Sequence, residues 1–164
     1  MLNMDYVEIF KNIPPQLATF LIATLPIAEL RAAIPIALGV YHLPVFSTYL
    51  ISVLGNILPI IFLLWFLDPL SNWLSKHSRF FKKFFDWIFK RTRQRFSKKY
   101  ERWGLFALTL FVAIPLPVTG GWTGSMAAFL FGIPFKKAFP LIVLGILIAG
   151  VIVTLASLGI FSFF

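Results

Sequence analysis

The 164-residue sequence contains no cysteine and few charged residues, and both shortages narrow the class of protein. Without cysteine the chain can form no disulfide, no thiol nucleophile and no cysteine-ligated metal site. Charged residues make up 13% of the sequence, whereas soluble domains usually carry about 25%. Three long stretches have no Asp, Glu, Lys or Arg at all: residues 32–67, 103–135 and 138–164. Because a membrane-spanning helix needs roughly 20 apolar residues, the sequence predicts an all-α, multi-pass protein of the cell membrane.

The sequence also lacks the short motifs of the common enzyme classes. It shows no nucleotide-binding loop, no metalloprotease motif and no Ser/Lys dyad of recognisable spacing. The two histidines, His42 and His77, do not have the spacing of metal ligands. We therefore expect no enzymatic activity, no cofactor and no metal. The acidic N-terminal residues, in place of a basic leader, predict that the chain has no cleavable signal peptide.

Positive charge is concentrated in one segment, residues 71–103. This segment holds eleven basic and two acidic residues, and so accounts for the whole net charge of +9. Its aromatic and basic residues alternate at helical spacing, which is typical of a helix lying in the membrane interface. A solvated loop and a nucleic-acid-binding segment are the alternatives, but flanking membrane segments make lipid headgroups the nearest phosphates. We expect it to bind anionic headgroups, not nucleic acid, through Lys82, Lys83, Lys90, Arg91 and Arg93.

Two apolar stretches are interrupted where a smooth spanning helix would continue. Residues 13–40 contain prolines around a Glu-x-Arg pair, and residues 104–133 contain prolines followed by glycines. A proline inside a helix removes one backbone hydrogen bond and clashes with the preceding turn. Each stretch is therefore predicted to form two half-helices joined at a break. A full helix follows each of them, over residues 45–67 and 138–161.

The two halves of the chain align as a weak internal repeat at an offset of about 90 residues. Pro44 stands eleven residues before Gly55 in the tripeptide Val-Leu-Gly, and Pro134 stands eleven residues before Gly145 in the same tripeptide. Corresponding broken segments in two halves point to a transporter site at the interface of the repeats. Chance similarity between apolar sequences is the alternative. We expect one membrane domain, residues 1–164, with repeats at 13–67 and 104–161.

Charge predicts the relative orientation of the repeats. If residues 71–103 and Lys136-Lys137 both lie in the cytoplasm, the two full helices run in opposite directions. The broken segments then become re-entrant hairpins from opposite faces, and both chain ends lie outside. The rival arrangement has four simple spans and places Lys136-Lys137 outside. We favour the inverted repeat because only this arrangement satisfies both basic clusters.

The hairpin tips carry the residues that we expect to form a substrate or proton pathway. A charge at membrane depth costs about 3 kcal/mol on insertion scales, so it persists when it pairs, faces water or functions. Burial would favour a neutral Glu29, whereas a nearby Arg31 would favour its charged form. A purely structural ion pair, helix packing at the glycines and a packing role for Trp122 are the alternatives. The candidate pathway residues are Glu29, Arg31, Pro35, Pro115, Pro117, Thr119, Gly120, Gly121, Trp122 and Thr123.

Two segments resemble the signatures of the small multidrug export family: Glu29-Leu-Arg31-Ala-Ala-Ile-Pro35 and Pro115-Leu-Pro117-Val-Thr119-Gly120-Gly121-Trp122-Thr123-Gly124. The family is similar to the DedA superfamily, and this resemblance implies two opposed re-entrant hairpins and the movement of lipids such as undecaprenyl phosphate, with proton coupling. DedA proteins carry arginines near the second break, but residues 111–121 of this chain have none. The resemblance implies a small transporter or lipid translocase for an amphipathic or lipid-phosphate substrate. The alternative is a non-transporting scaffold, and association with a second copy is left open.

Overall fold

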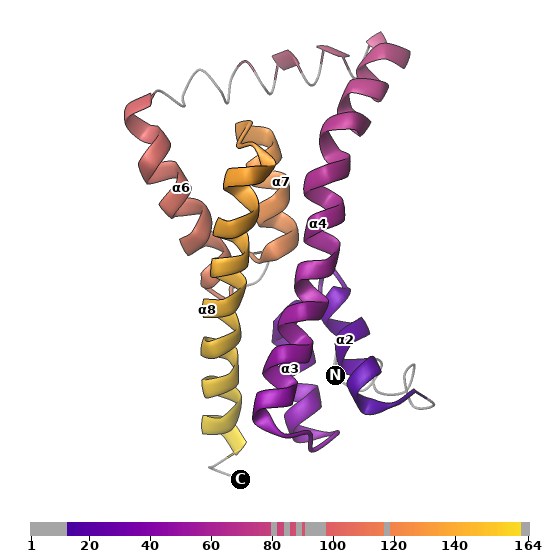
Figure 1. Cartoon of the computed structure of the whole chain (residues 1–164), viewed down its shortest axis with the longest axis vertical. Helices are drawn as coiled ribbons and strands as arrows, with labels where there is room; N and C mark the ends of the chain where they lie inside the picture. Colours follow the sequence, from indigo (N-terminus) through magenta and orange to yellow (C-terminus); the bar gives the residue numbers. More distant parts are fainter. Residues whose placement is uncertain are drawn as a thin grey trace.

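The computed structural model describes residues 13–79, 82–83, 86–87, 90, 98–116 and 119–161. Every regular element within these residues is a helix, as the sequence predicts (Figure 1). In chain order the helices are α2 (Pro15–Thr24), α3 (Glu29–Gly39), α4 (Val45–His77), α6 (Lys98–Ala113), α7 (Gly121–Phe131) and α8 (Phe135–Phe161).

Two of the helices, α4 and α8, are long and apolar enough to cross a membrane. At about 1.5 Å per residue, the 33 residues of α4 and the 27 residues of α8 both exceed a hydrocarbon core of roughly 30 Å. Only 33% of the most apolar window of α4 is buried within the protein. Large apolar side chains such as Phe62, Trp65 and Leu155 are exposed. A soluble protein would cover such faces, so the chain is a membrane protein.

The ends of the basic segment differ from the prediction. Residues 71–77 continue α4, and α6 begins at Lys98, so residues 71–103 do not form one separate helix. Helix α4 extends past the predicted end at residue 67 and includes Pro69, and residues 70–77 beyond it contain no further proline or glycine. Lys82, Lys83 and Lys90 have helical backbone and are exposed. Arg91 and Arg93 lie outside the described residues.

The first break separates α2 from α3 over residues 25–28. Leu25 is extended, with a ψ of 137°, because the following Pro26 disfavours the helical conformation in the residue before it. The chain then turns back, and the backbone N–H of Glu29 donates to the carbonyl of Leu25 (3.0 Å). Helices α2 and α3 thus form a helical hairpin whose turn points to the middle of the molecule (Figure 1).

The second break separates α6 from α7, and its turn also points to the middle of the molecule, from the opposite end (Figure 1). Helix α6 ends at Ala113, two residues before Pro115, and α7 begins only at Gly121. The hydroxyl of Thr119 organises this turn: it accepts from the N–H of Leu116 (3.1 Å) and lies 2.7 Å from the carbonyl of Ile114. The side chain thereby satisfies backbone groups that the interrupted helix leaves free.

The long helices run in opposite directions, with α7 between them and with α2 and α6 on their outer sides in this view (Figure 1). Helix α2 packs on α4 and α6 packs on α8, while α3 packs on α8 and α7 packs on α4. Two glycines permit the closest approaches. A Cβ at Gly55 would lie 2.5 Å from the carbonyl oxygen of Phe20, and one at Gly145 would lie 2.9 Å from that of Thr109. Each long helix therefore touches the backbone of the first short helix in its own half.

Candidate functional site

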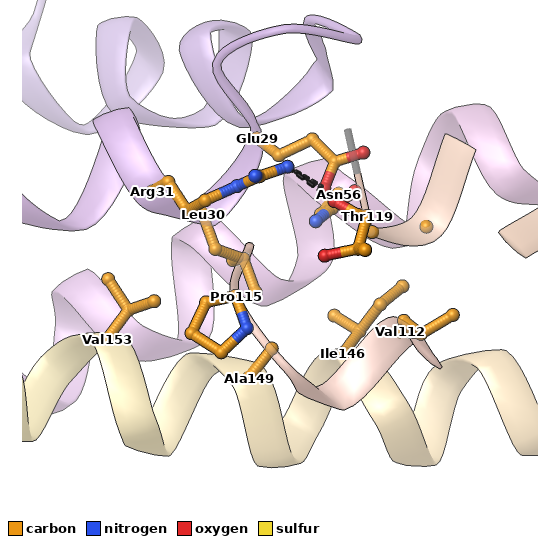
Figure 2. A pocket seen from close by; sticks show the side chains of 12 residues that line it. Glu29, Leu30, Arg31, Asn56, Val112, Pro115, Thr119, Ile146, Ala149 and Val153 are labelled. Carbon is orange, nitrogen blue, oxygen red and sulfur yellow. Dashed lines mark hydrogen bonds and ion pairs between the residues drawn. The ribbon is translucent and has the colours of Figure 1, made fainter. Parts of the chain in front are cut away.

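The two breaks meet around the carboxylate of Glu29, the first residue of α3 (Figure 2). Its side chain is almost fully buried, with a relative exposure of 4% for the residue. The backbone N–H of Trp122 donates to Oε1 of Glu29 (3.3 Å). The N–H of Gly121 and the side chain of Asn56 also interact with the carboxylate. Helix α7 thus directs its N-terminal amides at a negative charge from the other half, which its dipole also favours.

Arg31 joins the same two breaks with its guanidinium. Its two terminal nitrogens donate to the backbone carbonyls of Leu116 and Thr119. Nη2 of Arg31 also lies 3.7 Å from Oε2 of Glu29, a longer contact than the carbonyl bonds. The side chain is 25% exposed, so one side of the guanidinium remains accessible. Arg31 therefore binds mainly to irregular backbone that a continuous helix would not leave free.

Unusual backbone conformations position both sides of this contact. Glu29 has a φ of 44°, and a non-glycine residue held there costs about 1–3 kcal/mol. Gly120, which precedes α7, has a φ of 145°, and a Cβ at this position would collide with Oε2 of Glu29. The strained glutamate and the obligatory glycine are therefore parts of one contact. Strain of this kind is often found at functional sites.

Trp122 contributes a second link between the halves. Its indole Nε1 donates to the carbonyl of Thr24, the last residue of α2 (3.1 Å). The ring also packs against the main apolar core. Both contacts support the interpretation of Trp122 as a packing residue that holds the two turns together.

Six of the ten predicted pathway residues line one small cavity between the breaks: Glu29, Arg31, Pro115, Thr119, Gly120 and Gly121. Trp122 does not line it, but its backbone N–H donates to Glu29, which does. Pro35 and Thr123 do not line it: Pro35 lies within α3, and the Thr123 hydroxyl is 3.3 Å from the carbonyl of Gly120. Pro117 lies outside the described residues.

The two glycines of Gly120-x-x-x-Gly124 serve different contacts. Gly120 faces Glu29, whereas a Cβ at Gly124 would lie 2.5 Å from Cγ2 of Val112 in α6. Helix packing therefore accounts for Gly124, and contact with the ion pair accounts for Gly120.

Sequence reasoning missed Asn56, which lines the same cavity and is 1% exposed. A single amide within the apolar run of α4 has little effect on hydropathy. Only its position in the sequence pointed to it: a polar side chain in the middle of a spanning helix is buried and therefore needs a hydrogen-bond partner. Glu29 is that partner (Figure 2).

Comparison with known proteins gives one match. A family model described as "Putative small multi-drug export protein" matches residues 29–152, which is well over half of the chain. The match begins at Glu29 and includes the residues that line the cavity except Val153. No curated protein and no solved structure matches the chain.

Proposed function

Because the chain belongs to this small multi-drug export family, we propose that it is a membrane transporter whose substrate passes the Glu29–Arg31 centre. One observation carries the proposal. Two helix breaks almost 90 residues apart meet around two charged side chains at the middle of the molecule (Figure 2). A simple structural helix has no need of a break, and irregular backbone at membrane depth is tolerated where it is buried in protein or lines a cavity.

The proposed architecture is an inverted repeat of two re-entrant hairpins. Equivalent positions make equivalent contacts: Gly55 approaches Phe20 in the first half, and Gly145 approaches Thr109 in the second. The second short helix of each half lies against both long helices, since α3 and α7 each pack on α4 and on α8. The antiparallel directions of α4 and α8 support the same scheme (Figure 1). In such transporters the substrate site lies near the midplane, where the repeats meet.

The substrate class follows from the groups at the centre. The N-terminal amides of α7 and the guanidinium of Arg31 attract negative charge, which suits a phosphate or carboxylate headgroup. In this structure the carboxylate of Glu29 accepts from an α7 amide and lies 3.7 Å from Nη2 of Arg31, whose terminal nitrogens donate to backbone carbonyls. An amphipathic substrate with an anionic headgroup, such as a lipid phosphate, would therefore compete with Glu29. The outer faces of α4 and α8 are apolar, so the hydrocarbon tails of such a substrate could remain in the lipid beside them.

Competition for the same donors also supplies a mechanism for proton coupling. A protonated Glu29 is neutral, so it releases the α7 amides to the anionic headgroup and leaves the positive charge of Arg31 without a nearby carboxylate. When the substrate leaves, Glu29 loses its proton and binds the donors again. One proton would then accompany each headgroup, because both cannot hold the centre in charged form.

A non-transporting scaffold is the second candidate function. The specific observation in its favour is that both charged groups are partnered across the two halves, as a structural latch would be. Flux in proteoliposomes distinguishes the two. We expect the purified protein to move a fluorescent lipid phosphate across the bilayer faster when a pH gradient is imposed. A well-folded protein with no flux of either this lipid or a cationic drug, with or without the gradient, would favour the scaffold.

A further inference from the structure

Three polar side chains form a stripe along α4 that leads to the Glu29 centre. Thr48, Ser52 and Asn56 follow one another at four-residue steps, so they share one face of the helix. All three are buried, with relative exposures of 0%, 0% and 1%. At 1.5 Å per residue the stripe spans about 12 Å, from the first turn of α4 to the carboxylate of Glu29.

The oxygen atoms of this stripe have no hydrogen-bond partner within the described part of the chain. This holds for Oγ1 of Thr48, Oγ of Ser52 and Oδ1 of Asn56. Four other buried hydroxyls behave differently, because each donates to the carbonyl four residues earlier: Thr19, Ser125, Thr154 and Ser157. The hydroxyl of Thr109 donates to the carbonyl of Leu141 on α8. The hydroxyls of Thr48 and Ser52 are thus turned away from their own backbone. Buried polar atoms of this kind call for a ligand, because native proteins pair nearly all of them.

Comparison of the two halves shows that packing does not require these polar groups. At the offset of 90, positions 48, 52 and 56 correspond to Ala138, Ile142 and Ile146 on α8. Those three residues are equally buried, and their side chains are apolar. The same fold therefore closes this face with apolar side chains in the second half.

Both ends of the stripe meet polar features. At the inner end, Asn56 and Glu29 line a cavity of ≈ 10 Å³, which is about the space for one water molecule. At the outer end, Tyr41 lies in the short connection between α3 and α4, and its hydroxyl is buried without a partner among the described residues. On α3, Ala33 and Ala37 continue the four-residue steps from Glu29 and are fully buried.

We propose that Thr48, Ser52 and Asn56 line a narrow water path that carries protons between Glu29 and the membrane face at residues 40–44. Each hydroxyl oxygen accepts a proton from one water molecule and passes its own proton to the next. Asn56 orients the last water, which gives its proton to the Glu29 carboxylate. One proton and one positive charge move per event, and no bond other than O–H changes. Among charged side chains of the described residues, Arg31 is the one within ion-pair distance of Glu29.

This inference rests on the proposed role of Glu29 as a proton carrier, but thiol accessibility tests the path separately. The chain has no cysteine, so a single introduced cysteine is the only thiol that can react. Thr48→Cys and Ser52→Cys would be compared with Ala138→Cys and Ile142→Cys, their matched positions on α8. The protein in lipid nanodiscs is treated with silver ion, a small hydrated cation that reacts with thiolates. Thiols that remain are then counted with a maleimide after denaturation.

We expect the two α4 cysteines to react about tenfold faster than the α8 controls, since the thiolate that reacts is disfavoured in a dry apolar site. Thr48→Cys should also react faster than Ser52→Cys, because it lies nearer the entrance. Equal, slow reaction at 48, 52 and 138 would overturn the path. If one α4 variant unfolds, the other still decides the comparison with Ala138→Cys. A Glu29→Gln protein that keeps both flux and fast reaction at Ser52→Cys would refute the carrier role and leave the water path standing.

Discussion

Gly120 and Glu29 are in such close contact that no side chain fits at the glycine. A Cβ at Gly120 would collide with Oε2 of Glu29, and the backbone there has a φ of 145°. The contact joins the turn before α7 to the start of α3, so it fixes how the two breaks meet. The lack of space for a Cβ and the positive φ each favour glycine at position 120.

Gly120→Ala is therefore expected to destabilise the protein by at least about 1–3 kcal/mol, the cost of one strained backbone conformation. Thermal unfolding of the purified protein in detergent measures the effect. Gly159→Ala is the matched control, because nothing lies within 4 Å of a Cβ at that helical position. The control should be neutral or stabilised by roughly 0.8–1.0 kcal/mol, as alanine favours a helix over glycine. Equal unfolding temperatures for both variants would show that the Gly120 contact is not tight in solution.

The location of the breaks was predictable because prolines and glycines act locally. Pro26 fixes Leu25 in an extended conformation, and Pro115 follows the end of α6 at Ala113. Proline alone does not mark a break, because Pro35, Pro59 and Pro140 lie inside helices. The sequence also predicted that Glu29 and Arg31 would lie near the second break, since two short hairpins from opposite faces would meet near the bilayer midplane. Their actual partners were not predictable. Backbone amides and carbonyls bind both side chains, and such groups leave no trace in residue types.

Two other features escaped prediction for different physical reasons. The end of α4 at His77 was missed because hydropathy marks where a helix leaves the membrane and not where its hydrogen bonding stops. The stripe of Thr48, Ser52 and Asn56 was missed because three small polar residues hardly lower the hydropathy of α4. Its four-residue spacing was present in the sequence, but burial of that face became clear only from the packing.

Topology is tested by the reaction of single cysteines with an impermeant thiol reagent added outside intact cells. In the inverted arrangement Lys83→Cys and Lys136→Cys both face the cytoplasm and should be protected. His42→Cys, in the exposed connection before α4, should react and serves as the positive control. Labelling of Lys136→Cys from outside would instead establish four simple spans and refute the re-entrant hairpins.

The basic segment is expected to bind anionic lipid surfaces. Each basic side chain near such a surface contributes about 1 kcal/mol, so a peptide of residues 71–103 should lose roughly 3 kcal/mol of binding when Lys82, Lys83 and Lys90 become glutamine. Binding to phosphatidylserine vesicles is measured by sedimentation at low and high salt. Affinity should fall with salt, because exposed charges are screened. A native peptide that binds neutral and anionic vesicles equally well would rule out the electrostatic anchor.

The Glu29–Arg31 pair separates a transporter from a scaffold, and the geometry favours a folded Glu29→Gln protein. The ion pair measures 3.7 Å, whereas Arg31 makes its shorter bonds to the carbonyls of Leu116 and Thr119. Those bonds remain when the carboxylate becomes an amide. The amide oxygen of glutamine can also still accept from the N–H of Trp122.

We therefore expect Glu29→Gln to unfold near the wild-type temperature but to lose proton-driven flux, because glutamine cannot carry a proton. If the pair were only a latch, stranding Arg31 would cost roughly 3–5 kcal/mol and the protein would not accumulate. The double variant Glu29→Gln with Arg31→Met should then restore folding, since no buried charge remains. The measurements are purified yield, unfolding temperature and lipid-phosphate flux in proteoliposomes for both variants. A stable Glu29→Gln protein with normal flux would remove Glu29 from the mechanism, and rescue of folding by the double change would assign the pair to the scaffold.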